Sequence, residues 1–278
     1  MIPPIANRFV AGEHPAVALE HARRLNDRGV NAILNLLGEH YEDRESAADD
    51  ADEYRRLIDD IAAAELSACV SVKPTQLGLD VGEDVFRELL AAVVSHGRKR
   101  DVFVWLDMED HTTTDATLEA YEELAREHGG GIGVCVQANL RRTRDDVERL
   151  ADVPGKVRFT KGAYDEPASV AYTDKTVVDR ELLSLLEYAF AEYDGAVAVG
   201  SHDPAVIERA IALHETYGTD FEIQMLMGVR EDTQYELASE YEVWQYVPHG
   251  DRWKSYFYRR MTERTENITF AARAVLGR

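Results

Sequence analysis

The sequence predicts an α/β fold, a (βα)8 TIM-type barrel that residues 1–278 form as a single domain with a short N-terminal lead-in. Eight short apolar runs alternate with longer amphipathic stretches, and this alternation is typical of βα units around a parallel sheet. The chain has 278 residues, 45% of them hydrophobic, which is long enough for one barrel-sized domain or two smaller ones. No Gly-x-Gly-x-x-Gly motif follows the first run, which disfavours a doubly wound sheet, the main structural alternative.

Each strand is predicted from an apolar run whose length suits a buried strand of a parallel sheet. We expect strands over residues 32–37, 69–73, 102–107, 133–137, 157–161, 196–200, 221–226 and 243–247. The amphipathic segments between these runs predict helices over residues 46–64, 84–96, 114–127, 143–151, 174–193, 204–217 and 230–239. Thr114 and Asp203 are expected to cap two of them, because short polar side chains accept hydrogen bonds from the first free backbone N–H groups. Pro204 suits the first position of a helix.

The composition is strongly acidic, with 52 Asp and Glu against 31 Lys and Arg and a formal net charge of −21. This balance argues against a nucleic-acid partner, because phosphates are bound by clustered Lys and Arg. Acidic pairs such as Glu42-Asp43 and Asp49-Asp50 lie in segments that we expect to be exposed. The excess charge is therefore interpreted as solubility charge, which is compatible with a halophilic source.

Neither cysteine belongs to a Cys-x-x-Cys or Cys/His pattern. Cys69 and Cys135 each lie inside an apolar run, which predicts buried free thiols in a reducing compartment, with no disulfide and no metal site. The first residues show no signal-peptide pattern, and no apolar run is long enough to span a membrane. We therefore expect a cytoplasmic protein and leave peripheral contact with the inner face of the membrane open. The sequence does not indicate the oligomeric state.

Charged or hydrogen-bonding residues stand at or beside most of the predicted strand ends. In a (βα)8 barrel these carboxyl ends form the active site. Lys73, Asp107, Gln137 and Lys161 fall at the last position of their apolar runs, where the ordinary polarity of loops is a weaker explanation. Further polar residues just beyond strand ends are Glu39, Glu109, Ser201, His202 and His249.

Near the end of the chain, aromatic residues directly precede an adjacent arginine pair. The stretch reads Tyr256-Phe257-Tyr258-Arg259-Arg260 and has helical spacing. Two neighbouring guanidinium groups form a planar fork for one carboxylate, so the pair is a candidate for binding an acid. The alternative is a solvated basic face of a helix.

Several segments together resemble the FAD-dependent proline dehydrogenases. They are Lys73-Pro74-Thr75-Gln76, Leu106-Asp107-Met108-Glu109, Arg158-Phe159-Thr160-Lys161-Gly162 and Tyr258-Arg259-Arg260. The likeness runs in the same order from about residue 9 to residue 267. With no second catalytic domain in the chain, it resembles the monofunctional enzymes rather than the fusion with an aldehyde dehydrogenase.

The resemblance implies a flavoenzyme of proline catabolism, which oxidises L-proline to Δ1-pyrroline-5-carboxylate by hydride transfer to FAD and passes electrons to a quinone-type acceptor. Lys73, Arg259 and Arg260 match family positions that hold the substrate carboxylate. Asp107 matches a catalytic carboxylate, and we expect it to pair with Lys73. Arg158 matches the arginine beside the reacting nitrogen of the flavin, where positive charge stabilises the anionic reduced form.

The resemblance also implies residues that line the substrate and the cofactor. Tyr246 matches an aromatic wall of the proline ring with a catalytic role, and Leu226 is expected to pack on the same ring. Glu39 resembles an acid that pairs with a substrate-binding arginine and gates the pocket. The implied FAD contacts, besides Arg158, are Met108, Gln137, Lys161, Gly162, Ala163, Ser201 and His202.

Three residues depart from the family pattern. Asn139 and His249 stand where tyrosine is frequent, and Ser201 stands where threonine is common. These departures leave the packing around the flavin open. Two other functions stay open as alternatives: a flavin dehydrogenase or oxidase of another cyclic or secondary amino acid, and a non-catalytic amino-acid-binding barrel. Arg158 and Lys161 argue against the second, because a mere binder has no developing flavin charge to stabilise.

Overall fold

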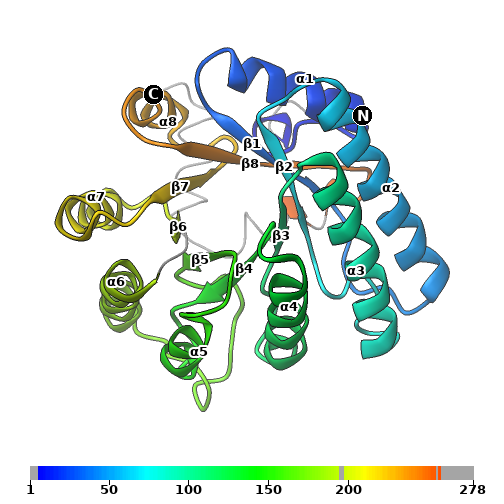
Figure 1. The fold of residues 1–278 in the computed structure, drawn as a ribbon. Coiled ribbons are helices and arrows are strands. Elements are labelled where there is room, and N and C mark those ends of the chain that lie inside the picture. The colour runs from blue at the N-terminus through cyan, green and yellow to red at the C-terminus, as the bar shows by residue number, and fades with distance from the viewer. Residues whose placement is uncertain (1–5, 194–196, 255, 258–278) are drawn as a thin grey trace.

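Eight parallel strands close into a ring in chain order, and β8 pairs again with β1. This is the (βα)8 barrel that the sequence predicts, with its helices outside the ring of strands (Figure 1). The computed structural model describes residues 6–193, 197–254, 256 and 257. The strands are β1 (Asn31–Leu36), β2 (Ala68–Val72), β3 (Val104–Leu106), β4 (Ile132–Gln137), β5 (Lys156–Thr160), β6 (Val197–Gly200), β7 (Phe221–Leu226) and β8 (Val243–His249).

The helices follow the predicted amphipathic segments, with one addition in the lead-in. They are α1 (Pro15–Asn26), α2 (Arg44–Ala63), α3 (Glu83–Arg100), α4 (Thr114–His128), α5 (Thr143–Leu150), α6 (Lys175–Glu192), α7 (Pro204–Tyr217) and α8 (Glu231–Leu237), after the short 3₁₀ helix η1 (Ala6–Arg8). The sequence analysis did not predict α1. Its Ala- and Leu-rich composition and its proline in the first turn favour a helix, so local propensity could have indicated it.

The two predicted caps have different outcomes. Asp203 caps α7, where its carboxylate accepts from the N–H of Ala205 at 3.1 Å and Pro204 takes the first helical position. The prediction for Thr114 is wrong, because Thr113 is the cap residue of α4 and its side chain makes no capping bond. The Thr113 hydroxyl donates instead to the carbonyl of Asp110 at 2.8 Å.

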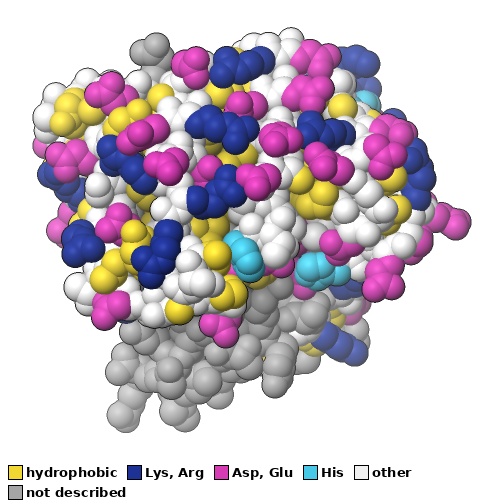
Figure 2. Space-filling model, turned by 90° about the horizontal axis from the view of Figure 1, so that it is seen from below, with side chains coloured by type: hydrophobic (Ala, Val, Ile, Leu, Met, Phe, Trp, Pro, Cys, Tyr) yellow, Lys and Arg dark blue, Asp and Glu magenta, His cyan; other side chains and the backbone are white. Residues whose placement is uncertain are grey.

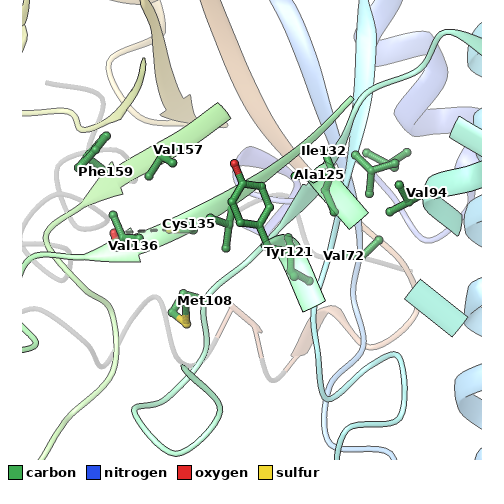
Figure 3. Packing of buried hydrophobic residues seen from close by; sticks show 14 of the residues in the cluster. Val72, Val94, Met108, Tyr121, Ala125, Ile132, Cys135, Val136, Val157 and Phe159 are labelled. Atoms are coloured by element: carbon green, nitrogen blue, oxygen red, sulfur yellow. Dashed lines mark hydrogen bonds between the residues drawn. The ribbon is translucent and has the colours of Figure 1, made fainter. Parts of the chain in front are cut away.

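Strand side chains alternate between two layers, because successive residues of a strand point to opposite faces of the sheet. The larger layer lies between strands and helices, and Figure 3 shows Tyr121 of α4 in it among Ile132, Val136 and Val157 of the strands. A smaller apolar cluster lies inside the barrel. It contains Ile33, Cys69, Trp105 and Ala198. The barrel interior also holds polar and charged side chains, and these form the site described below.

The two ends of the described chain meet beside the seam between β8 and β1. The N–H of Ala11 donates to the carbonyl of Pro248 at 2.9 Å, and the N–H of Gly250 donates to the carbonyl of Gly12 at 2.9 Å. A small separate core covers this junction. It consists of Ala6, Val10, Leu37, Trp253 and Tyr256. The lead-in is therefore packed against the last strand and the segment after it.

Acidic and basic side chains are interspersed over the face of the molecule that Figure 2 shows. Cys69 and Cys135 are both buried free thiols, as the sequence predicts. Among the described residues, no helix combines the length and the apolar character that crossing a bilayer requires.

His249, the last residue of β8, has a fully buried ring. Among the described residues, neither ring nitrogen has a hydrogen-bond partner. Burial lowers the pKa of His249 from 6.5 to about 4, because the charged ring loses its hydration. Between these pH values the unfolded chain binds a proton that the folded chain does not. The free energy of unfolding therefore falls as the pH falls through this window.

We expect His249→Phe to remove this contribution. In urea unfolding at about pH 7 and about pH 4.5, the wild type should lose roughly 2–3 kcal/mol more than the variant. Carboxylates titrate in both proteins, so their effect cancels in the difference between the two. Parallel losses in the two proteins would show that the buried ring does not stay neutral.

Candidate active site

Asp107 follows β3 directly and is the centre of a polar cluster inside the barrel. Its Oδ1 accepts from the hydroxyl of Ser71 at 2.6 Å and from the guanidinium of Arg158. Its Oδ2 accepts from the hydroxyl of Tyr246 at 2.6 Å. Burial and the charge of Asp107 raise the pKa of Tyr246 well above its usual value, so the phenol stays a donor. Residues from β2, β5 and β8 thus fix the direction of one carboxylate.

Arg158 is a buried cation on β5, with only 5% of its surface exposed. One arm of its guanidinium donates to Oε1 of Gln224 at 3.0 Å, and the other donates to Asp107. The guanidinium carbon lies 4.9 Å from the ring centre of Trp105 and 5.9 Å from that of Tyr246. Burial alone lowers the pKa of Arg158, but the charge of Asp107 raises it above its usual value. The positive charge inside the barrel is therefore permanent.

The expected pairing of Asp107 with Lys73 is wrong. The ammonium of Lys73 donates to Oε2 of Glu39 at 3.2 Å, and the two side chains are 8% and 21% exposed. Both oxygens of Asp107 are already occupied, by Ser71 and Arg158 on one side and by Tyr246 on the other. Lys73 and Glu39 lie at the ends of β2 and β1, so the long side chain reaches the neighbouring strand end instead. The gating role of Glu39 stays a prediction.

A second buried carboxylate supports the loops behind the site. Glu109 accepts from the N–H of Thr75 at 2.8 Å and from its hydroxyl at 2.9 Å. Burial raises the pKa of Glu109, and these bonds oppose that rise. The side-chain amide of Gln137 donates to the carbonyl of Glu109 at 2.8 Å and accepts from the N–H of Ala163 at 3.2 Å. Gln137 thereby joins the exits of β3, β4 and β5.

Lys161 follows β5 and lies between two aspartates. Its ammonium contacts Asp179 of α6 at 2.6 Å and Asp203 at the start of α7 at 2.9 Å. Burial lowers the pKa of Lys161, but the two aspartate bonds raise it above its usual value, so the cation is retained. Lys161 therefore ties the β5 exit to the start of the next helices.

Gly162 adopts a φ of +107°, a conformation that L side chains rarely adopt. A Cβ at this position would lie 2.1 Å from Oδ1 of Asn139. That buried oxygen has no hydrogen-bond partner among the described residues. The backbone at 162 therefore leaves space, next to an open acceptor, that any other residue would fill.

The exits of β6 and β7 are joined through His202. Its Nε2 accepts from the N–H of Leu226 at 2.8 Å, so this nitrogen carries no proton. The hydroxyl of Ser201 accepts from the N–H of Asp203 at 3.2 Å. Both predicted cofactor contacts therefore lie at one rim of the barrel and also support its backbone.

The outcomes for Met108, Arg259 and Arg260 differ. The side chain of Met108 belongs to the apolar layer between strands and helices (Figure 3), and its contact with a cofactor stays a prediction. Arg259 and Arg260 lie outside the described residues, and their role stays a prediction. In the part of the chain that is described, no three His, Cys, Asp or Glu side chains are grouped to hold a metal ion.

Several residues of the cluster were missed because they lie within strands rather than at their ends. They are Ser71 on β2 and Glu222 and Gln224 on β7. A polar residue inside an otherwise apolar run, as in Val70-Ser71-Val72 or Ile223-Gln224-Met225, was the available signal. Buried polar groups need partners, so such a residue indicates a contact across the barrel.

A family model described as proline dehydrogenase matches residues 18–273 of the chain. Proline dehydrogenase 1 of Bacillus subtilis is 36% identical over 275 residues, covering 98% of this chain and 90% of that protein. The chain belongs to the proline dehydrogenase family. Another relative, the proline dehydrogenase of Deinococcus radiodurans, is 35% identical over 280 residues and is covered to the same extents, 98% and 90%.

Solved structures of proline utilization A share the fold of this family member. The protein from Bdellovibrio bacteriovorus, inactivated by N-propargylglycine, matches with a TM-score of 0.86 and 24% identity. The match covers 95% of this chain and 33% of that one. The protein from Corynebacterium freiburgense matches with a TM-score of 0.79 and 20% identity, covering 97% and 32%. The chain thus spans about a third of the length of these larger proteins.

Gly162→Ala should destabilise the protein more than Gly218→Ala. Gly218 also has a positive φ, +76°, but no atom lies within 4 Å of a Cβ built there. That control measures the backbone strain alone, which costs about 1–2 kcal/mol. At Gly162 the contact with Asn139 adds to it, and Asn139→Ala in the same chain should recover part of the loss. Equal losses in urea unfolding for the two alanine variants would contradict the close approach.

Proposed function

We propose that this protein oxidises L-proline to Δ1-pyrroline-5-carboxylate, the first step of proline catabolism, with FAD as its cofactor and a quinone-type electron acceptor. Membership of the proline dehydrogenase family supports proline as the substrate. The observation that carries the proposal is the buried cluster inside the barrel, where Arg158 of β5 and Tyr246 of β8 meet Asp107 at the end of β3. A permanent cation buried inside the barrel suits the stabilisation of negative charge that develops during a reaction.

The residues around β5 fit a flavin. Gly162 leaves room for close approach, and the free acceptor of Asn139 faces that room among the described residues. Gln137, Lys161, Ala163, Ser201 and His202, together with the backbone of Met108, would hold the cofactor. Bound FAD would supply the acceptor for the hydride. Arg158 would hold positive charge beside it, and Asp107 would keep the guanidinium in place.

Substrate binding would use the opposite side of the cluster. Lys73 has three donor hydrogens and Glu39 takes one of them, so the ammonium can also meet a substrate carboxylate. We propose that Arg259 and Arg260 complete this anion site and that Glu39 gates it. Tyr246, fixed by its bond to Asp107, would form the wall against the proline ring with Leu226 beside it. A rigid wall would exclude bulkier rings by about 1–3 kcal/mol.

We further propose that the enzyme acts in the cytoplasm and contacts the inner face of the membrane peripherally when it meets its acceptor. We propose this membrane contact because quinones are apolar and dissolve in the bilayer. If the electron acceptor were water-soluble, the enzyme would need no contact with the membrane.

Purified protein reconstituted with FAD should be yellow and should bleach with L-proline under anaerobic conditions. Spectra recorded before and after the addition of proline check this. Failure to bind FAD would contradict the proposal. Bleaching by another cyclic or secondary amino acid, but not by proline, would favour the alternative substrate. Binding of proline without any bound flavin would favour a non-catalytic binding barrel.

Arg259→Met should raise the KM for proline at least tenfold. It removes charged hydrogen bonds to the carboxylate that are worth about 1.5–3 kcal/mol. Steady-state kinetics with Arg100→Met as a control test this, since Arg100 forms a surface ion pair with Asp59 on the outer helices and is about half exposed. An unchanged KM in a folded Arg259→Met protein would contradict the anion-binding role.

A further inference from the structure

A line of polar side chains runs through the barrel from β7 to Asp107. Gln224 is only 4% exposed and uses both ends of its amide. Its Oε1 accepts from Arg158 at 3.0 Å, and its Nε2 donates to Oε1 of Glu222 at 2.6 Å. Glu222 forms an ion pair with Lys156 near the start of β5. Together with Asp107, these four residues form an unbroken chain of contacts.

The orientation of the Gln224 amide is determined by its neighbours. Arginine can only donate, so the amide oxygen must face Arg158. Burial raises the pKa of Glu222 above its usual value, and the ion pair with Lys156 opposes this rise. Its Oε1 accepts from the amide nitrogen of Gln224. Burial lowers the pKa of Lys156, but the charge of Glu222 and the hydrogen bond to it raise this pKa above its usual value. A flipped amide would place its NH2 group against a cation.

Small residues on β6 make this contact across the barrel possible. Strand β6 lies between β5 and β7, with Ala198 paired to both Arg158 and Glu222 and Gly200 paired to Gln224. A Cβ at Gly200 would lie 3.4 Å from Cγ of Arg158 and 2.7 Å from a methyl of Thr160. A larger side chain at either position would separate Arg158 from Gln224.

Arg158 is therefore held at both arms. Asp107 binds one and Gln224 binds the other, while the rings of Trp105 and Tyr246 flank the guanidinium. Loss of Gln224 would leave one arm without its described partner, and the guanidinium could turn about its bond to Asp107. A displaced guanidinium would stabilise the developing negative charge less, because such electrostatic stabilisation requires the charge to be in place before the reaction.

We propose that Gln224 is a positioning residue that fixes the guanidinium of Arg158, and that Glu222 and Lys156 fix the orientation of Gln224. The proposal rests on the proposed function, in which Arg158 faces the flavin. Gln224 would act through Arg158 and would not touch the substrate. Its loss should therefore change kcat and the reduction potential of the bound flavin while leaving substrate affinity alone.

The first test is Gln224→Met, which keeps the length of the side chain and removes both hydrogen bonds. We expect kcat with proline to fall roughly tenfold, with KM within about twofold of the wild type. The midpoint potential of the flavin, measured by photoreduction against a dye, should fall. A tenfold shift of a two-electron equilibrium corresponds to about 30 mV.

Gln245→Met is the matched control. Gln245 is a fully buried glutamine on β8 that bonds His21 and Gln234 on the helix side of the barrel. The control should lose similar stability in urea unfolding and keep its potential and kcat. The proposal would be overturned if Gln224→Met had the same kcat and flavin potential as the wild type. Equal losses of kcat in Gln224→Met and Gln245→Met would also overturn it.

A double variant, Glu222→Leu with Lys156→Met, tests the far end of the line. Both residues are replaced together, because removing one partner leaves an unpaired buried charge, whereas an apolar pair is usually tolerated. We expect the potential and kcat to fall in the same direction as in Gln224→Met, by a smaller factor, because Arg158 keeps its bond to Gln224. An unchanged potential would overturn the role of Glu222 and Lys156.

The wild-type measurements separate this inference from the proposed function. Photoreduction does not use proline, so the potentials can be compared whatever the substrate is. Wild-type protein that binds FAD but is not reduced by proline would contradict the proposed substrate and leave the comparison of potentials decisive for Gln224. Wild-type protein reduced by proline, with no effect of Gln224→Met, would contradict the inference alone.

Discussion

The ion pair between Arg158 and Asp107 lies inside the barrel, where charges are costly to bury. Removing two ions from water is offset only when their geometry is good and their other hydrogen bonds are made. Here Ser71 and Tyr246 donate further hydrogen bonds to the carboxylate of Asp107, and Gln224 accepts one from the guanidinium of Arg158. Side chains from β2, β5, β7 and β8 are therefore committed to one pair. Loss of either charge would leave the other buried without a counter-ion, so the pair constrains most of the barrel interior.

The sequence predicted the barrel because its evidence was repetitive. Each of the eight apolar runs, with its amphipathic neighbour, independently indicates a βα unit. An error at one boundary therefore does not change the predicted fold. Strand ends also marked Lys73, Asp107, Gln137 and Lys161 as candidates, and each lies at or next to the end of its strand. Helix α1 was missed since it precedes the first strand and lies outside that repeating pattern.

The partners of the site residues could not be predicted in the same way. Strand order indicates which positions are neighbours, but a long side chain can turn to either side. Lys73 thus meets Glu39, and Asp107 is occupied by Arg158 from a strand two places further round. The contact between Arg158 and Gln224 also depends on Ala198 and Gly200 between them, and small residues carry no pattern of their own. Side-chain direction and available space decided these pairs.

The junction at the β1–β8 seam has a consequence for the order of events during synthesis. Ala11 and Gly12 bond to residues of the last strand and the turn after it, at the other end of the sequence. Contacts between such distant positions close a long loop and form late. Tyr246, on the same last strand, cannot reach Asp107 until β8 has been synthesised. The emerging chain therefore carries Asp107 without the hydroxyl of Tyr246, and the cluster around this carboxylate is complete only after β8 has been made.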